Sequence, residues 1–208
     1  MASKDREYRS FSMVKRADVE EREYIVEGYA STFEPYVMFV EHYEDGDIEY
    51  KEQIARNAFD NTDMSDCVFR IDHEGRVYAR TSAGTVKLSV DDNGLYNETD
   101  LSKTQNSRDL YEDIKAGNYP QMSFAFTIEE EHYDRNTHTR IIDKVGRLYD
   151  ISPVAFPANP TTSLSARSKD FYDGEIEKER TERFELERKQ RALDIIKNSL
   201  KEIKNYEE

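Results

Sequence analysis

Residues 121–128 carry the pattern that most restricts how this chain can fold. Bulky apolar side chains alternate strictly with small or polar ones, which is typical of a β-strand with one buried face. The bulky face carries Met122, Phe124, Phe126 and Ile128, and the other carries Gln121, Ser123, Ala125 and Thr127. The pattern therefore predicts a core strand that presents one hydroxyl, that of Ser123, beside the small Ala125, where an extended backbone could approach.

Two further segments supply titratable side chains. Residues 148–157 form a β-branched and aromatic run that contains Asp150 and ends in a Pro-rich turn. His73 continues the apolar face of a predicted strand at residues 67–71. The chain thus offers histidine, serine and acid in that order, and these three residue types can act together as base, nucleophile and orienting group.

Each of the three also has a structural interpretation. A histidine on an apolar strand face can be a core residue, and a serine within a strand is usually structural. Asp150 could equally hold the neighbouring turn through Ser152. Spacing alone does not choose between these readings, and Ser123 lacks the G-x-S-x-G elbow of the α/β-hydrolases.

Composition argues against several classes of protein. The formal net charge of −14 argues against nucleic-acid binding, which needs clusters of Lys and Arg. No apolar run approaches the ~20 residues of a membrane helix, and we expect neither membrane contact nor a signal peptide. The single cysteine, Cys67, cannot form an internal disulfide and fits a reducing cytoplasm.

The chain reads as one domain with an appendage. Residues 1–21 form a polar N-terminal segment, 22–166 the folded domain and 167–208 a charged tail. Within the domain we expect loops at 34–50, short helices at about 51–59 and 107–116, and strands at 24–33, 67–71, 77–90, 95–101, 121–128 and 139–156. Many strands and few helices favour a compact β-barrel.

The tail, residues 167–208, differs in kind from the rest. It holds 11 Lys or Arg against 12 Asp or Glu, and its apolar positions follow a heptad-like spacing at Leu186, Leu193, Ile196, Leu200 and Ile203. The pattern predicts a long charged helix with one narrow apolar seam. Such a helix can pack on its own domain, dock on a partner or support a homo-oligomer.

An ordered series of motifs adds specificity. It comprises Gly28–Phe33, Ile54–Phe59, Asp72–Glu74, Ala79–Thr85, Asn93–Tyr96, Met122–Phe126, Leu148–Val154 and Pro157–Pro160. Over roughly residues 24–166 this series resembles the tailed-phage (HK97-type) prohead maturation serine proteases, which are related to the herpesvirus assemblin-like proteases. It departs from the family pattern in lacking Gly before Ala58, and in having Asp72 for Asn, Ala125 for Gly and Asp150 for Glu.

The resemblance implies a mainly β (α+β) fold, a closed antiparallel barrel ringed by short helices. It also implies that His73 is the general base, Ser123 the nucleophile and Asp150 the orienting acid. Because a tight turn can aim backbone donors at a developing charge, the turn after Asp150 is a candidate oxyanion site. The candidate oxyanion or substrate-binding residues are Ala125, Ala158, Asn159 and Thr161. We expect no cofactor, and no metal, because the spacing of His132 and His138 fits no standard site.

The implied activity is that of a serine endopeptidase that works on proteins. Its expected substrates are scaffold, the scaffold-like segment of the major capsid protein, and the protease itself. It would act in the host cytoplasm, inside the assembling prohead. The alternative is a catalytically silent capsid-assembly module that acts through the C-terminal helix.

Overall fold

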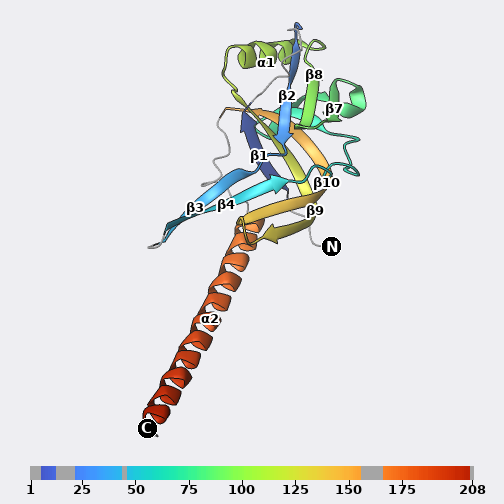
Figure 1. Ribbon diagram of the computed structural model, residues 1–208. Coiled ribbons are helices and arrows are strands. Elements are labelled where there is room, and N and C mark those ends of the chain that lie inside the picture. The colour runs from blue at the N-terminus through green and yellow to red at the C-terminus, as the bar shows by residue number, and fades with distance from the viewer. Residues whose placement is uncertain (1–5, 13–21, 44–45, 156–165, 207–208) are drawn as a thin grey trace. The chain divides into compact units, whose positions relative to one another are not determined.

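The computed structural model describes residues 6–12, 22–43, 46–155 and 166–206 (Figure 1). The chain forms two compact units, Met1–Ser165 and Ala166–Glu208. The described elements of the first unit are β1 (Glu7–Ser12), β2 (Ile25–Thr32), β3 (Tyr36–Tyr43), β4 (Gly46–Ile54), β5 (Val68–Ile71), β6 (Glu74–Arg80), a 3-10 turn (Thr81–Ala83), β7 (Val86–Val90), β8 (Gly94–Asp100), α1 (Gln105–Lys115), β9 (Gln121–Asp134) and β10 (Thr139–Val154).

The strands form two sheets. The larger has the order β1-β9-β10-β4-β3, with β5 paired to the far part of β10 and β6 paired to β5. The smaller has the order β2-β8-β7, and β2 lies near β1 and β9 without pairing with them. Among the described strands, no pairing joins the two ends of either sheet. The mainly β class is therefore confirmed, whereas the closed barrel is not.

β9 is an interior strand of the larger sheet, paired to β1 on one side and β10 on the other (Figure 1). Its bulky row lies in the core as the alternation predicts, with Met122, Phe124, Phe126 and Ile128 at most 1% exposed. The Phe124 and Phe126 rings stack with centroids 4.6 Å apart. Burying such side chains contributes about 1.5–3 kcal/mol each, so this row fixes which face of β9 is turned away from the core.

The N-terminal segment differs from the prediction. Residues 7–12, expected within a polar stretch outside the domain, form β1 and pair antiparallel with β9. Glu7 and Arg9 point inward and are 0% and 5% exposed, and Arg9 binds the buried Glu52 of β4. Because charged residues rarely lie inside a domain, an inward-facing charged pair conceals the strand pattern.

The loop expected at residues 34–50 and the helix expected at 51–59 are also wrong. These residues form the antiparallel hairpin of β3 and β4, followed by turns. Tyr50, Glu52 and Ile54 are buried with a period of two, but the central acid hides that alternation in the sequence. The helix expected at 107–116 is confirmed as α1, and the Thr104 hydroxyl caps its start by accepting from the Ser107 N–H.

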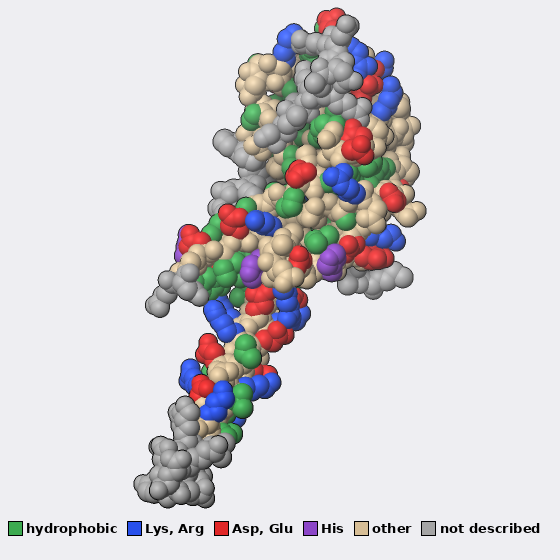
Figure 2. Space-filling model, in the orientation of Figure 1, with side chains coloured by type: hydrophobic (Ala, Val, Ile, Leu, Met, Phe, Trp, Pro, Cys, Tyr) green, Lys and Arg blue, Asp and Glu red, His purple; other side chains and the backbone are tan. Residues whose placement is uncertain are grey.

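The second unit is the single helix α2 (Ala166–Tyr206), as the charged tail predicts. Acidic and basic side chains alternate along its described surface (Figure 2). Its exposed apolar side chains are Phe184, Leu186, Leu193, Ile195 and Ile196. Of the helices in the described ranges, none combines the length and apolar character that crossing a membrane requires.

Candidate active site

His73 lies at the tip of the β5–β6 hairpin. Ile71 pairs with Glu74, so Asp72 and His73 form a two-residue turn. Both turn residues have positive φ, 46° for Asp72 and 61° for His73. A type I′ turn needs this geometry at both positions, because its twist matches that of the flanking strands. The turn lifts the imidazole off the end of β5 and aims it at the neighbouring strands.

The imidazole bridges the other two predicted site residues. His73 Nε2 lies 2.6 Å from Ser123 Oγ, and His73 Nδ1 lies 2.6 Å from Asp150 Oδ1. A carboxylate can only accept, so Nδ1 carries the proton and donates it to Asp150. Nε2 is then free to accept the Ser123 hydroxyl proton, which makes Ser123 a potential nucleophile.

Cross-strand register explains why these side chains meet. Asp150 of β10 is opposite Ala125 of β9, and Ser152 is opposite Ser123. Directly opposed residues share one face of a sheet, so Asp150 and Ser123 both lie on the face away from the bulky row of β9. Ala125 occupies the position two residues after Ser123, between the two polar groups, where its single methyl group leaves room for the imidazole.

Ala125 itself is 0% exposed. Ser123 is equally buried, so the role of Ala125 in substrate binding stays a prediction. The other three candidates for an oxyanion or substrate site, Ala158, Asn159 and Thr161, lie outside the described residues.

The hairpin tip is fastened to the end of β10 by three bonds. The Asp72 N–H donates to the Pro153 carbonyl at 3.2 Å. The Ala155 N–H donates to Asp72 Oδ1 at 3.1 Å. The His73 N–H donates to Ser152 Oγ at 3.3 Å. These contacts join the turn to the strand that bears Asp150.

β1 also contributes to this face. In its register with β9, Tyr8 is opposite Ala125 and Ser10 is opposite Ser123. The Tyr8 ring packs edge-on against the His73 imidazole, with centroids 4.6 Å apart and planes at 64°. Tyr8 was not a candidate from sequence. The signal that could have shown it is the alternation of Tyr8, Ser10 and Ser12 with the inward-facing Glu7 and Arg9.

Exposure differs among the three bridged side chains. Ser123 is 0% exposed, the Asp150 side chain is 2% exposed and that of His73 is 17% exposed. The imidazole is therefore the member that water reaches most easily. Low exposure strengthens the hydrogen bonds of the group, because water competes less for its donors and acceptors.

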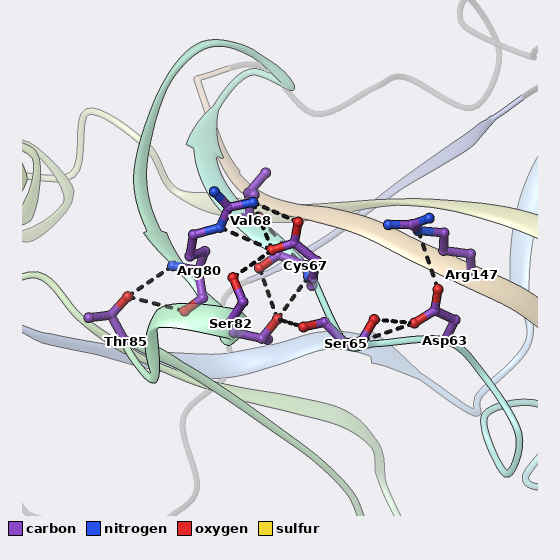
Figure 3. A network of polar contacts seen from close by, with 10 residues as sticks. Asp63, Ser65, Cys67, Val68, Arg80, Ser82, Thr85 and Arg147 are labelled. Atoms are coloured by element: carbon purple, nitrogen blue, oxygen red, sulfur yellow. Dashed lines mark hydrogen bonds and ion pairs between the residues drawn. The ribbon is translucent and has the colours of Figure 1, made fainter.

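The motif Ala79–Thr85 supports the hairpin from its base (Figure 3). Arg80 donates from Nε and Nη2 to Asp66, at 3.0 and 2.7 Å to Oδ1. The Thr81 hydroxyl accepts from the Cys67 N–H at 2.9 Å, and the Thr85 hydroxyl accepts from the Arg80 N–H at 2.9 Å. The motif therefore has a structural role, holding the start of β5 against the end of β6.

Cys67, at the start of this region, is a buried free cysteine. Burial raises the pKa of its thiol, and the nearby negative charge of Asp150 raises it further. The thiol is therefore protonated at neutral pH and is a poor nucleophile. Ser123 is the stronger candidate for covalent chemistry here.

Comparison with known proteins places the chain in a family. Residues 11–175 match the family described as caudovirus prohead serine protease. Among solved structures, the chain is similar to the bacteriophage T4 capsid assembly protease gp21, with 11% sequence identity and a TM-score of 0.45, over 72% of this chain and 96% of that one. No curated protein matches the chain in sequence. Because the family match covers most of its length, this chain belongs to the caudovirus prohead serine proteases.

Proposed function

We propose that the chain is a serine endopeptidase in which Ser123 is the nucleophile, His73 the general base and Asp150 the orienting acid. The observation that carries the proposal is the pair of 2.6 Å contacts that places the imidazole between the other two side chains. Family membership supports the same reading, since a serine protease needs these three roles.

In the first step, Ser123 Oγ attacks the scissile carbonyl carbon while its proton passes to His73 Nε2. The Oγ–C bond forms and the carbonyl π electrons move onto oxygen, which gives a tetrahedral oxyanion. Asp150 stabilises the imidazolium through the Nδ1–H contact. Collapse of the intermediate breaks the C–N bond, and Nε2 returns the proton to the leaving amine. Water then repeats the sequence to release the acyl group.

The oxyanion requires hydrogen-bond donors, and backbone N–H groups are the usual source. The sequence around Ala158, Asn159 and Thr161 remains our candidate for this role. Replacing these three side chains should change turnover less than replacing Pro157 or Pro160 would, because the expected donors belong to the main chain.

The proposed substrates are scaffold or the scaffold-like segment of the major capsid protein, inside the assembling prohead, and the protease itself. Support comes from the family description, which names prohead proteases. The C-terminal helix is proposed to recruit the enzyme to its partner or to a second copy of the chain. Truncation after Ala166 should then leave peptide cleavage intact while incorporation into proheads falls.

The test is self-cleavage on expression. Wild-type chain should yield a shortened product that Ser123→Ala restores to full length. His73→Ala should act similarly, and because the members of a triad work as a unit, the double variant should be no worse than either single one, each losing on the order of 10⁴ in rate. Asp150→Asn should also slow turnover strongly with little effect on stability. A double variant far slower than both single variants would show that the two residues do not share a mechanism.

The catalytically silent alternative predicts the opposite result. A purely structural module would show no cleavage by wild-type chain in isolation or with capsid protein, and Ser123→Ala would support prohead assembly as well as wild type does. The close contact of all three polar side chains favours the enzyme, since a silent relative is free to lose it.

A further inference from the structure

The Ser152 hydroxyl bonds both residues of the His73–Asp150 pair. Its Oγ donates to Asp150 Oδ1 at 2.8 Å and accepts from the His73 N–H at 3.3 Å. The residue is 0% exposed. One buried hydroxyl thus bonds both the main chain of the histidine and the carboxylate that the same histidine contacts.

The bond to the His73 N–H stabilises a backbone that is unfavourable for histidine. A φ of 61° lies in the left-handed region, which residues other than glycine rarely adopt unless their surroundings hold them there. The other two fastenings of the tip involve Asp72. The Ser152 hydroxyl, by contrast, accepts from the main-chain N–H of His73 itself.

The bond to Asp150 fixes the direction of the carboxylate. Oδ1 accepts from both the Ser152 hydroxyl and His73 Nδ1. With two donors on one oxygen, rotation of the carboxylate would break both bonds together. Without the hydroxyl, Asp150 Oδ1 keeps only its bond from the imidazole, and the His73 N–H loses its acceptor.

We propose that Ser152 is a positioning residue of the active site, which sets the imidazole by holding its main chain and its carboxylate partner at the same time. It acts through His73 and Asp150, the two residues to which its hydroxyl is bonded. The proposal rests on the catalytic roles given above for Ser123 and His73.

The direct test is Ser152→Ala in the full chain. A fluorophosphonate probe reports the reactivity of Ser123, and a peptide spanning a mapped self-cleavage site reports kcat and KM. Loss of a partner that orients a reacting group typically costs 10- to 100-fold, so we expect about that loss in both labelling rate and kcat, with KM unchanged. The downfield proton resonance of His73 Nδ1–H should shift or broaden.

The matched control is Thr99→Val. Thr99 is also 0% exposed, and its hydroxyl donates to Asn97 Oδ1 at 3.0 Å within the smaller sheet. The Thr99→Val substitution removes one buried hydrogen bond of a hydroxyl and leaves the hairpin that carries His73 unchanged. In the Thr99→Val variant, the rate at which the probe labels Ser123 and the His73 Nδ1–H resonance should match wild type. This should hold even if the unfolding temperature of the variant falls as far as that of Ser152→Ala.

The outcomes separate the two proposals. If Ser152→Ala keeps the wild-type labelling rate and resonance, the positioning role is wrong while Ser123 and His73 retain theirs. If wild-type Ser123 is not labelled at all, the proposed function itself fails. Should Ser152→Ala not fold, Ser152→Cys keeps a side chain of the same connectivity with a slightly larger, weakly hydrogen-bonding thiol, and it carries the same expectation.

Discussion

Glu52→Gln should destabilise the fold much more than an exposed glutamate does. Glu52 is 0% exposed and accepts from Arg9 Nη2 at 2.6 Å and from Arg140 Nη1 at 3.2 Å. It also accepts from Arg9 Nε and the Tyr36 hydroxyl. The substitution keeps the shape of the side chain but removes its charge and turns an amide NH₂ toward an arginine.

The expected loss in the free energy of unfolding follows from the buried charges that the substitution leaves without their partner. In the Glu52→Gln variant two arginines stay buried, Arg140 at 0% and Arg9 at 5% exposure, and a neutral amide replaces the carboxylate between them. Breaking a buried ion network by removing one partner costs about 3–5 kcal/mol, and losing two charge-assisted bonds at about 1.5–3 kcal/mol each gives a similar sum. For a chain of this size that corresponds to about 10 °C in Tm.

The assay is urea unfolding of wild type and of two variants. Glu98→Gln is the control, because Glu98 binds Arg22 and Lys87 at 2.7 and 2.9 Å in partly exposed pairs, which should be worth under ~1 kcal/mol. An unchanged m value would show that the native and unfolded states keep their surface areas. Equal losses in the two variants would refute the reasoning that burial makes the Glu52 network costly to break.

Three further predictions concern other parts of the first unit. Gly94→Ala should lower the free energy of unfolding in urea by about 3 kcal/mol or more, because a Cβ at this position, with φ +157°, would lie 2.0 Å from the Ser31 carbonyl oxygen. Gly75→Ala is the control: a Cβ there would meet nothing within 4 Å, so the loss should be only about 1–2 kcal/mol. Equal losses in the two variants would contradict the clash at Gly94. Cys67 should resist iodoacetamide at pH 8 in the native chain and react after unfolding in urea; rapid native labelling would show that the thiol is accessible. For Asp100, burial raises the pKa, but bonds from Ser102 and an adjacent lysine outweigh it and lower the pKa from 3.8 to about 2. Its ionised form therefore stabilises the fold above about pH 4, and this contribution is lost as pH falls toward 2; Asp100→Asn should flatten the acid side of a stability–pH curve, and an unchanged slope would contradict the shift.

Much of the site could be predicted because its strands follow simple patterns. The period-two alternation of β9 placed Ser123 on the face opposite the core, and the register of β10 brings Asp150 to the same face. The apolar face leading to His73 was visible as well. The left-handed turn that carries His73 has no glycine or asparagine at either position, so its geometry was not visible from local turn chemistry.

The missed elements share a physical cause. β1 and β4 bury charged side chains such as Glu7, Arg9 and Glu52, so a reading based on apolar periodicity misses both strands, and with β4 it misses the hairpin that β4 forms with β3. Barrel closure was a different problem, because it depends on which distant strands pair. The alternation along one strand does not contain that information.

The placement of β1 has a consequence for when activity can arise. Ser10, near the start of the chain, pairs with Ser123, and Ser152 from further along pairs with the same residue on its other side. The strand of the proposed nucleophile is therefore flanked by one strand that is synthesised well before it and one that is synthesised after it. Contacts of such long sequence separation form late and slowly. A growing chain cannot assemble the proposed site until β10 has left the ribosome, so we expect chains that end before Asp150 to be inactive.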